Sequence, residues 1–140
     1  MITRCFRRPE VLRKIPLDRP TVIEASAGTG KTFTLEHLVV EILLTTATPI
    51  QRILLVTFTD KATRELRARL RSKLEELTSP DRGTDESDAA TDSFFRIDDR
   101  ARERLTEALR ALDVTTIATI HAFCQRVLQD NAFASGQHSF

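Results

Sequence analysis

One eight-residue stretch carries the residues with the clearest chemistry: Ala25, Ser26, Ala27, Gly28, Thr29, Gly30, Lys31 and Thr32. When such a stretch joins a buried strand to a helix, its backbone N–H groups can converge on one anion, and the helix N-terminus adds positive potential. The pattern is close to Gly-x-x-x-x-Gly-Lys-Ser/Thr, a phosphate-binding loop, with Ala25 in place of the first Gly. We therefore predict that these eight residues bind the phosphates of ATP.

Four of these residues have separate predicted tasks. Gly28 and Gly30 would let the backbone approach phosphate oxygens closely. Lys31 would reach the β- and γ-phosphates and the Thr32 hydroxyl would ligate Mg²⁺, so both are candidate catalytic residues. The alternative is a glycine-rich turn that only begins a helix, with Lys31 solvated. The strand–loop–helix context favours the phosphate loop.

The elements that must position this loop are read from hydrophobic spacing. The apolar run at 53–58 predicts a strand buried on both faces. Leucines spaced by three or four residues predict a helix that Asp60 caps, and the last helix is expected to be buried through Phe123, Val127 and Leu128. The order is strand, helix, strand, helix, helix, strand, helix, at residues 21–25, 31–45, 53–58, 60–77, 98–112, 114–120 and 121–131. This alternation predicts an α/β fold, a parallel sheet with flanking helices.

The composition is that of one globular domain. The 140 residues are 41% hydrophobic and 29% charged, with a formal net charge of +1, which argues against disorder and against a uniformly basic nucleic-acid binder. No apolar stretch approaches the roughly 18–20 residues of a membrane span, and there are only two cysteines, so we expect no membrane and a cytoplasmic location. We expect a basic lead-in at 1–20 and a domain at 21–140, with a mobile acidic loop at 78–97.

Two more segments place polar and aromatic side chains just after predicted strands. One reads Thr57-Phe58-Thr59-Asp60-Lys61-Ala62-Thr63-Arg64-Glu65-Leu66, and the other reads Thr119-Ile120-His121-Ala122-Phe123-Cys124. Both follow the carboxyl end of a strand, the edge at which open α/β sheets bind ligands. An aromatic ring such as Phe58 can stack on a nucleic-acid base, and threonine hydroxyls can hydrogen-bond phosphates.

These motifs resemble those of superfamily 1 DNA helicases of the UvrD/Rep type, and most of all the N-terminal part of RecB-type (beta) subunits of exodeoxyribonuclease V. The matching runs are IEASAGTGKTFTL at 23–35, LLVTFTDKATRELRARLR at 54–71 and TIATIHAFCQRVLQDNAFASG at 116–136. They follow the family's order, and Ala at position 25 is usual in that family. The resemblance implies a RecA-like P-loop NTPase fold, here as an incomplete first motor domain.

By this resemblance, the residues that contact single-stranded DNA are Thr57, Phe58, Thr59, Lys61, Arg64, Thr119 and His121. Plainer interpretations stand beside this one. Phe58 could belong to the core, and His121 could cap its helix. The row formed by Arg64, Arg67 and Arg71 could track phosphates or be an ordinary solvated face.

The parent of such a chain would couple ATP hydrolysis to the unwinding of DNA ends in recombinational repair, with the other subunits of a RecBCD-like complex. Hydrolysis also needs an acidic pair after a buried strand. The nearest pair, Asp98 and Asp99, is expected to start a helix instead. We therefore expect an N-terminal fragment that binds Mg-ATP and single-stranded or duplex-end DNA without turnover. Two alternatives stay open, a P-loop kinase for a small substrate and a non-catalytic P-loop interaction module.

Overall fold

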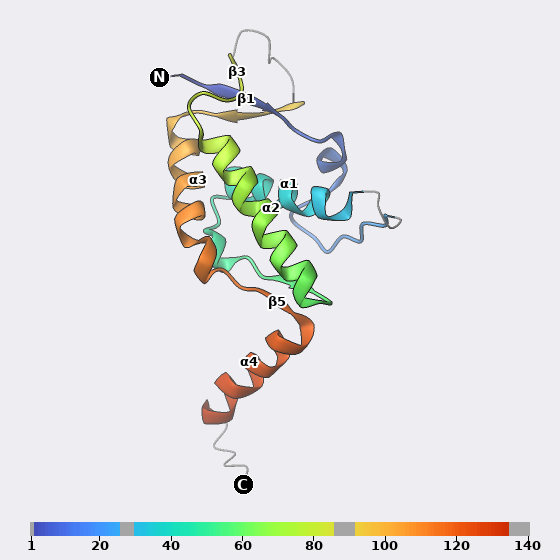
Figure 1. The fold of residues 1–140 in the computed structure, drawn as a ribbon. Coiled ribbons are helices and arrows are strands. Elements are labelled where there is room, and N and C mark those ends of the chain that lie inside the picture. The colour runs from blue at the N-terminus through green and yellow to red at the C-terminus, as the bar shows by residue number, and fades with distance from the viewer. Residues whose placement is uncertain (1, 26–29, 86–91, 135–140) are drawn as a thin grey trace.

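The computed structural model describes residues 2–25, 30–85 and 92–134. Figure 1 shows a body of packed helices with a small sheet at one end and a last helix that extends from the other end. The elements are β1 (Arg4–Arg7), η1 (Glu10–Lys14), α1 (Lys31–Thr45), η2 (Ile50–Arg52), β2 (Leu55–Thr57), α2 (Asp60–Thr78), β3 (Thr84–Asp85), β4 (Phe94–Ile97), α3 (Asp99–Ala111), η4 (Leu112–Val114), β5 (Ile117–Thr119) and α4 (Ile120–Ala134). The architecture is mixed α/β, as predicted, but its sheets are small. No helix in the described ranges has both the length and the apolar character that a membrane span needs.

Helix α2 lies at the centre of the core and packs against both α1 and α3. Its predicted leucine stripe is confirmed, because the four side chains are at most 3% exposed: Leu66, Leu70, Leu74 and Leu77. The start of the helix differs from the prediction. Thr59 is the cap, and its Oγ1 accepts a hydrogen bond from the Ala62 N–H at 3.0 Å, while Asp60 is already helical. A threonine hydroxyl oxygen can accept a hydrogen bond from an otherwise unpaired N–H at a helix start, as an aspartate carboxylate can.

Helices α1 and α3 also form where they were predicted. Helix α1 buries Val39, Val40 and Leu43 against the core. Helix α3 is capped by Asp98, whose Oδ1 accepts from the Ala101 N–H at 2.7 Å. The prediction that this carboxylate starts a helix is confirmed.

The three-stranded sheet, in the order β3–β1–β4, is antiparallel and was not predicted. In its register Cys5 of β1 lies between Thr84 of β3 and Arg96 of β4. Phe6 and Phe95, which also pair across β1 and β4, are 8% and 4% exposed. Two expectations are therefore corrected. The stretch 1–20 supplies a strand and core side chains, and the stretch 78–97, expected as a loop throughout, contains β3 and β4; its residues 86–91 lie outside the described part.

The second sheet is the parallel pair of β2 and β5, as the predicted alternation required. Its register pairs Leu55 with Ile117 and Thr57 with Thr119. The predicted strand at 21–25 is wrong: the segment is in no strand, and Val22 is 87% exposed. A β-branched run gives only propensity, and a strand also needs a hydrogen-bonded neighbour, which none of the described strands provides here.

Helix α4 forms, but its predicted burial is wrong. Val127 is 39% exposed and Leu128 is 71% exposed, and Figure 1 shows the helix pointing away from the body of the molecule. Hydrophobic spacing reports that a helix has an apolar face, and it does not report whether a neighbouring element lies close enough to cover that face.

Candidate functional site

The first part of the site is the N-terminus of α1. Gly30 precedes this helix with φ +88° and ψ 30°, a left-handed conformation that favours glycine. No side chain caps the helix and its first turn holds no acid, so neither the cap position nor the first turn offsets its positive end. Lys31 is exposed and Thr32 is half-buried, on the first turn, and Ala25 is half-buried. The predicted loop residues Ser26, Ala27, Gly28 and Thr29 lie outside the described residues.

This arrangement can hold an anion. Free N–H groups at a helix start attract phosphate, and a lysine on the first turn adds a mobile positive charge. Because Gly30 is left-handed, a residue with a Cβ would be strained there. The two described features that fit the predicted phosphate loop are therefore the glycine geometry and the uncapped helix end.

The second part of the site is the carboxyl end of β2. Thr57 ends the strand, and its Oγ1 lies 2.6 Å from the Oγ1 of Thr63. Thr59 caps α2, as described above. Phe58, between them, is 86% exposed, so it does not belong to the core. Lys61 is exposed on the first turn of α2.

The third part is the carboxyl end of β5. Thr119 is buried, and its Oγ1 accepts from the Ala122 N–H at 3.2 Å, so this threonine caps α4. His121, which was expected either to cap the helix or to meet DNA, is exposed and is not the cap. Thr57 and Thr119 are register partners. The structure therefore brings two of the three predicted segments together, as two threonine-capped helix starts at one end of a parallel pair.

The remaining predicted segment, at the start of α1, is linked to the strand-end edge of β2 and β5 through helix α2. Helix α1 packs against α2, and Glu36 Oε2 lies 3.7 Å from Arg69 Nη1 across their contact. Among the described residues no strand leads directly into α1, so the N-terminus of α1 is related to the strand-end edge through the contact between α1 and α2.

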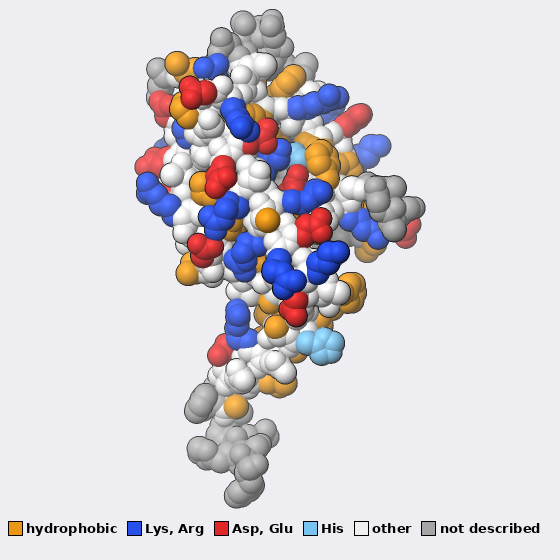
Figure 2. Space-filling model, viewed as in Figure 1, with side chains coloured by type: hydrophobic (Ala, Val, Ile, Leu, Met, Phe, Trp, Pro, Cys, Tyr) orange, Lys and Arg blue, Asp and Glu red, His pale blue; other side chains and the backbone are white. Residues whose placement is uncertain are grey.

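The arginine row on α2 divides into two kinds. Arg64 is exposed, and none of the described residues makes an ion pair or hydrogen bond to its guanidinium. Arg67 donates to the Leu112 carbonyl at 2.8 Å, and Arg71 donates to Asp113 Oδ1 at 2.6 Å. The idea of a continuous phosphate-tracking stripe is corrected, because two of its three members bind the protein itself. Figure 2 agrees with a mixed surface: acidic and basic side chains alternate across the face it shows.

One buried polar residue of helix α1, His37, lies outside the predicted motifs. His37 on α1 is buried, and its Nδ1 lies 2.7 Å from the Phe33 carbonyl, so Nδ1 is the protonated nitrogen. Burial lowers the pKa of His37; the positive charge of Lys73 acts in the same direction, and the hydrogen bond to Phe33 opposes it. The His37 ring also stacks on Phe95 with centroids 6.4 Å apart. Sequence spacing did not single out this histidine, because only the fold brings β4 against it.

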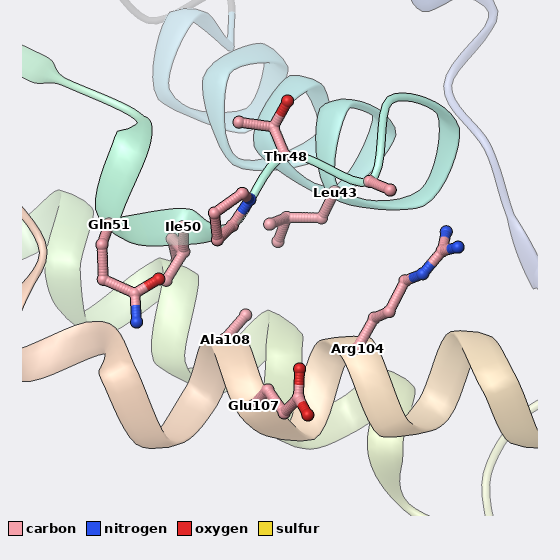
Figure 3. Close-up of a pocket in the computed structure, with 9 residues that line it drawn as sticks. Leu43, Thr48, Ile50, Gln51, Arg104, Glu107 and Ala108 are labelled. Atoms are coloured by element: carbon pink, nitrogen blue, oxygen red, sulfur yellow. The ribbon is translucent and has the colours of Figure 1, made fainter.

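Two cavities lined by described residues lie away from the strand-end edge. One of about 340 Å³ lies between α3 and the segment after α1, with Arg104 and Glu107 on the α3 side and Leu43 and Ile50 on the other side (Figure 3). Another, of about 480 Å³, is lined by Phe33 and His37 among others. Within the described ranges no group of three or more His, Cys, Asp or Glu side chains is placed to hold a metal ion.

Comparisons with known proteins agree on one family. A family model described as the UvrD/REP helicase N-terminal domain matches residues 10–140. The chain is similar to the RecBCD enzyme subunit RecB of Escherichia coli (strain K12), with 42% identity over 134 residues that cover 88% of this chain and 11% of that protein. It is 41% identical over 128 residues to the subunit of Mycobacterium tuberculosis (strain ATCC 25618 / H37Rv), covering 87% and 12%. For Haemophilus influenzae (strain ATCC 51907 / DSM 11121 / KW20 / Rd) the values are 37% over 141 residues, 89% and 12%. The chain thus spans 11–12% of the length of these relatives.

Proposed function

This chain belongs to the UvrD/REP helicase N-terminal domain family, and from that premise we propose that it is the part of a RecB-like DNA helicase subunit that binds Mg-ATP and single-stranded DNA. Its fold would be the first part of a RecA-like P-loop motor domain. The whole subunit would unwind DNA ends in recombinational repair, with the other subunits of a RecBCD-like complex and in the cytoplasm.

The uncapped, glycine-preceded N-terminus of α1 is the observation that carries the nucleotide part of the proposal. The phosphates would lie against the residues from Ala25 to Thr32, with Lys31 on the β- and γ-phosphates and the Thr32 hydroxyl on Mg²⁺. ATP hydrolysis supplies the free energy of strand separation in such motors. The residues of this chain contribute binding and orientation of the triphosphate, and neutralise its charge.

The strand-end edge carries the DNA part of the proposal. An exposed Phe58 offers its ring face to a base, which is worth about 1–3 kcal/mol per stacked base. Lys61 and Arg64 would contact phosphates on the first two turns of α2. The hydroxyl groups of Thr57, Thr59 and Thr119 would donate hydrogen bonds to the phosphates of the DNA backbone. His121 stands beside Thr119, exposed at the start of α4.

Turnover by this chain alone is not part of the proposal. Asp98, the nearest carboxylate that follows a strand, already accepts a hydrogen bond from the N–H of Ala101 as a helix cap. It also follows β4, a strand of the antiparallel sheet. Phosphate-loop motors place their acidic pair after a buried strand of the sheet that carries the phosphate loop. We expect binding of Mg-ATP without multiple turnover.

The test is a pair of matched lysine variants of the full 140-residue chain. Lys31→Ala should lower the affinity for a fluorescent ATP analogue in Mg²⁺ by at least about 100-fold, since its ammonium contacts two phosphates. Lys14→Ala, an exposed lysine at the end of η1, is the control and should bind the analogue normally. Circular dichroism should be the same for all three proteins. Unchanged affinity in Lys31→Ala would remove the nucleotide proposal and favour an interaction module.

A further inference from the structure

Arg67 was a candidate phosphate contact, and its surroundings point to another task. We propose that Arg67 is a positioning residue, which holds β5 beside β2 and thereby sets Thr119 next to Thr57 for DNA. The inference rests on the proposed binding of single-stranded DNA at the strand-end edge. It concerns how that edge is assembled, and not which groups touch DNA.

The contacts of Arg67 join distant parts of the chain. Its Nη1 donates to the Leu112 carbonyl at 2.8 Å and its Nη2 to the Ile117 carbonyl at 3.4 Å. Leu112 follows the last residue of α3, so the guanidinium also places a positive charge at the negative end of that helix. Ile117 is the first residue of β5. One side chain on α2 therefore reaches both ends of the short connection between α3 and β5.

Strand β5, which Arg67 contacts, is buried, but its hydrogen-bonded pairing with β2 is short. The sheet has two strands of three residues each, and an isolated two-stranded sheet is marginal in water. Outside the ladder itself, the Leu55 N–H donates to the Thr116 carbonyl at 3.0 Å. Helix α2 begins directly after β2, so a link from α2 to β5 also ties β5 to β2. Loss of this link should let Thr119 move relative to Thr57.

The neighbours of Arg67 show why it is not itself a phosphate contact. It is half-buried and two of its nitrogens already donate to carbonyls. Arg64, one turn earlier on the same row, is exposed and is the member that can reach a phosphate. Arg71, one turn later, pairs with an Asp113 side chain that is 73% exposed, so its link to the same connection is weaker.

The experiment compares binding of a labelled oligothymidylate to the full chain over a series of salt concentrations. A phosphate contact contributes about 0.7 to the slope of log affinity against log salt for single strands. Arg64→Met should lower both affinity and slope. Arg67→Met should lower affinity about 5- to 10-fold with the slope unchanged, and Arg67→Lys, which keeps one donor toward Leu112, should recover part of the loss. Arg71→Met should change affinity less than twofold.

Each outcome separates the possibilities. Affinities are corrected for the folded fraction measured by circular dichroism in the same buffers. A slope that falls in Arg67→Met as in Arg64→Met would make Arg67 a phosphate contact and overturn the inference. Lower stability with normal affinity of the folded protein would make Arg67 merely structural and overturn it too; if Arg67→Met does not fold, Arg67→Lys decides by the same two readouts. A wild-type chain that does not bind the oligonucleotide would instead defeat the proposed function, on which the inference rests.

Discussion

The antiparallel sheet and strand β2 of the parallel pair treat their apolar side chains differently. On the antiparallel sheet, Phe95 and Ile97 are 4% and 0% exposed, in contact with the helical core. On β2 and the segment that follows it, Val56 and Phe58 are 41% and 86% exposed, although the partner strand β5 is buried. The antiparallel sheet was not predicted from the sequence, whereas the parallel pair is flanked by the motifs that were.

The difference teaches that stability and chemistry lie in separate regions of this chain. Burial of apolar surface is the dominant favourable term in folding, so the region of β1, β4 and the helices should carry most of the free energy of unfolding. The edge formed by β2 and β5 offers exposed groups, which can meet a ligand because the protein itself does not cover them. Variants should therefore fall into two classes: those in the first region should lower the free energy of unfolding, and those at the strand-end edge should weaken ligand binding.

The largest expected effect is on stability, in the antiparallel region. Ile97→Ala should lower the free energy of unfolding by about 2–5 kcal/mol, because it removes a fully buried side chain and leaves a cavity. Val56→Ala, in the parallel pair, should lower it by no more than about 1 kcal/mol. Urea unfolding followed by circular dichroism measures both. Equal losses in the two variants would contradict the division into a stable and a chemical region.

The next effect compares two ion pairs of nearly equal length. Arg8 and Glu41 lie 2.7 Å apart with side chains 17% and 12% exposed, while Arg71 and Asp113 lie 2.6 Å apart with side chains 39% and 73% exposed. Glu41→Gln should lower the free energy of unfolding by about 2 kcal/mol, below the roughly 3–5 kcal/mol of a fully buried pair, because it removes the carboxylate that accepts two hydrogen bonds from Arg8, while the Asp92 carbonyl still accepts one. Asp113→Asn should cost less than about 1 kcal/mol.

A double variant is the control for this second prediction. In Arg8→Met with Glu41→Met, no unpaired charge is left, so the loss should be smaller than that of Glu41→Gln alone. If the double variant is less stable than the wild-type chain by the sum of the losses of Arg8→Met and Glu41→Met, the two side chains act independently, and the pair does not stabilise the contact between α1 and the segment that follows β1.

The sequence was most informative where the structure depends on local chemistry. The leucine stripe of α2 and the Asp98 cap follow from residues within one element and its immediate flank. The candidate site was read the same way, and the structure places Phe58 and Lys61 at an exposed strand end, as a ligand would require. These features need no knowledge of distant contacts.

The rest depends on contacts between distant residues. Strands β1 and β4 are four residues long and carry arginines among their apolar residues. Segments of this length are too short for an alternation of apolar and polar residues to be recognised. The partners of Arg67 lie 45 and 50 positions away in the chain, and α4 has an apolar face that the described residues leave uncovered. Hydrophobic spacing predicted helices α2 and α4 correctly and did not predict β1 and β4. Which side chains lie against each of these elements depends on how the chain packs in three dimensions.

The third prediction concerns the chemical region. Phe58→Ala should weaken binding of single-stranded DNA by about 1–3 kcal/mol, which is about 5- to 150-fold, because it removes a stacking face. Its free energy of unfolding should change by less than about 0.5 kcal/mol, since the ring is 86% exposed. Fluorescence anisotropy with an oligothymidylate measures the first and urea unfolding the second. Val114→Ala, also exposed at 75%, is the matched control and should leave DNA binding unchanged.

The smallest effect is a pH dependence that belongs to the stable region alone. Burial lowers the pKa of His37, so the folded chain binds a proton on this ring less readily than the unfolded chain, in which the pKa is near the ordinary value of about 6.5. Below that pH the unfolded state binds more protons, and the free energy of unfolding falls as the pH falls from about 7.5 to 5.5. His37→Gln should reduce this dependence, measured by urea unfolding at both pH values. Lys73, Glu36 and Glu76 also act on the ring, and if the charge of Lys73 assists burial as the geometry indicates, Lys73→Met should reduce the dependence in the same direction. A steeper dependence in His37→Gln would mean that other groups dominate the titration of this core.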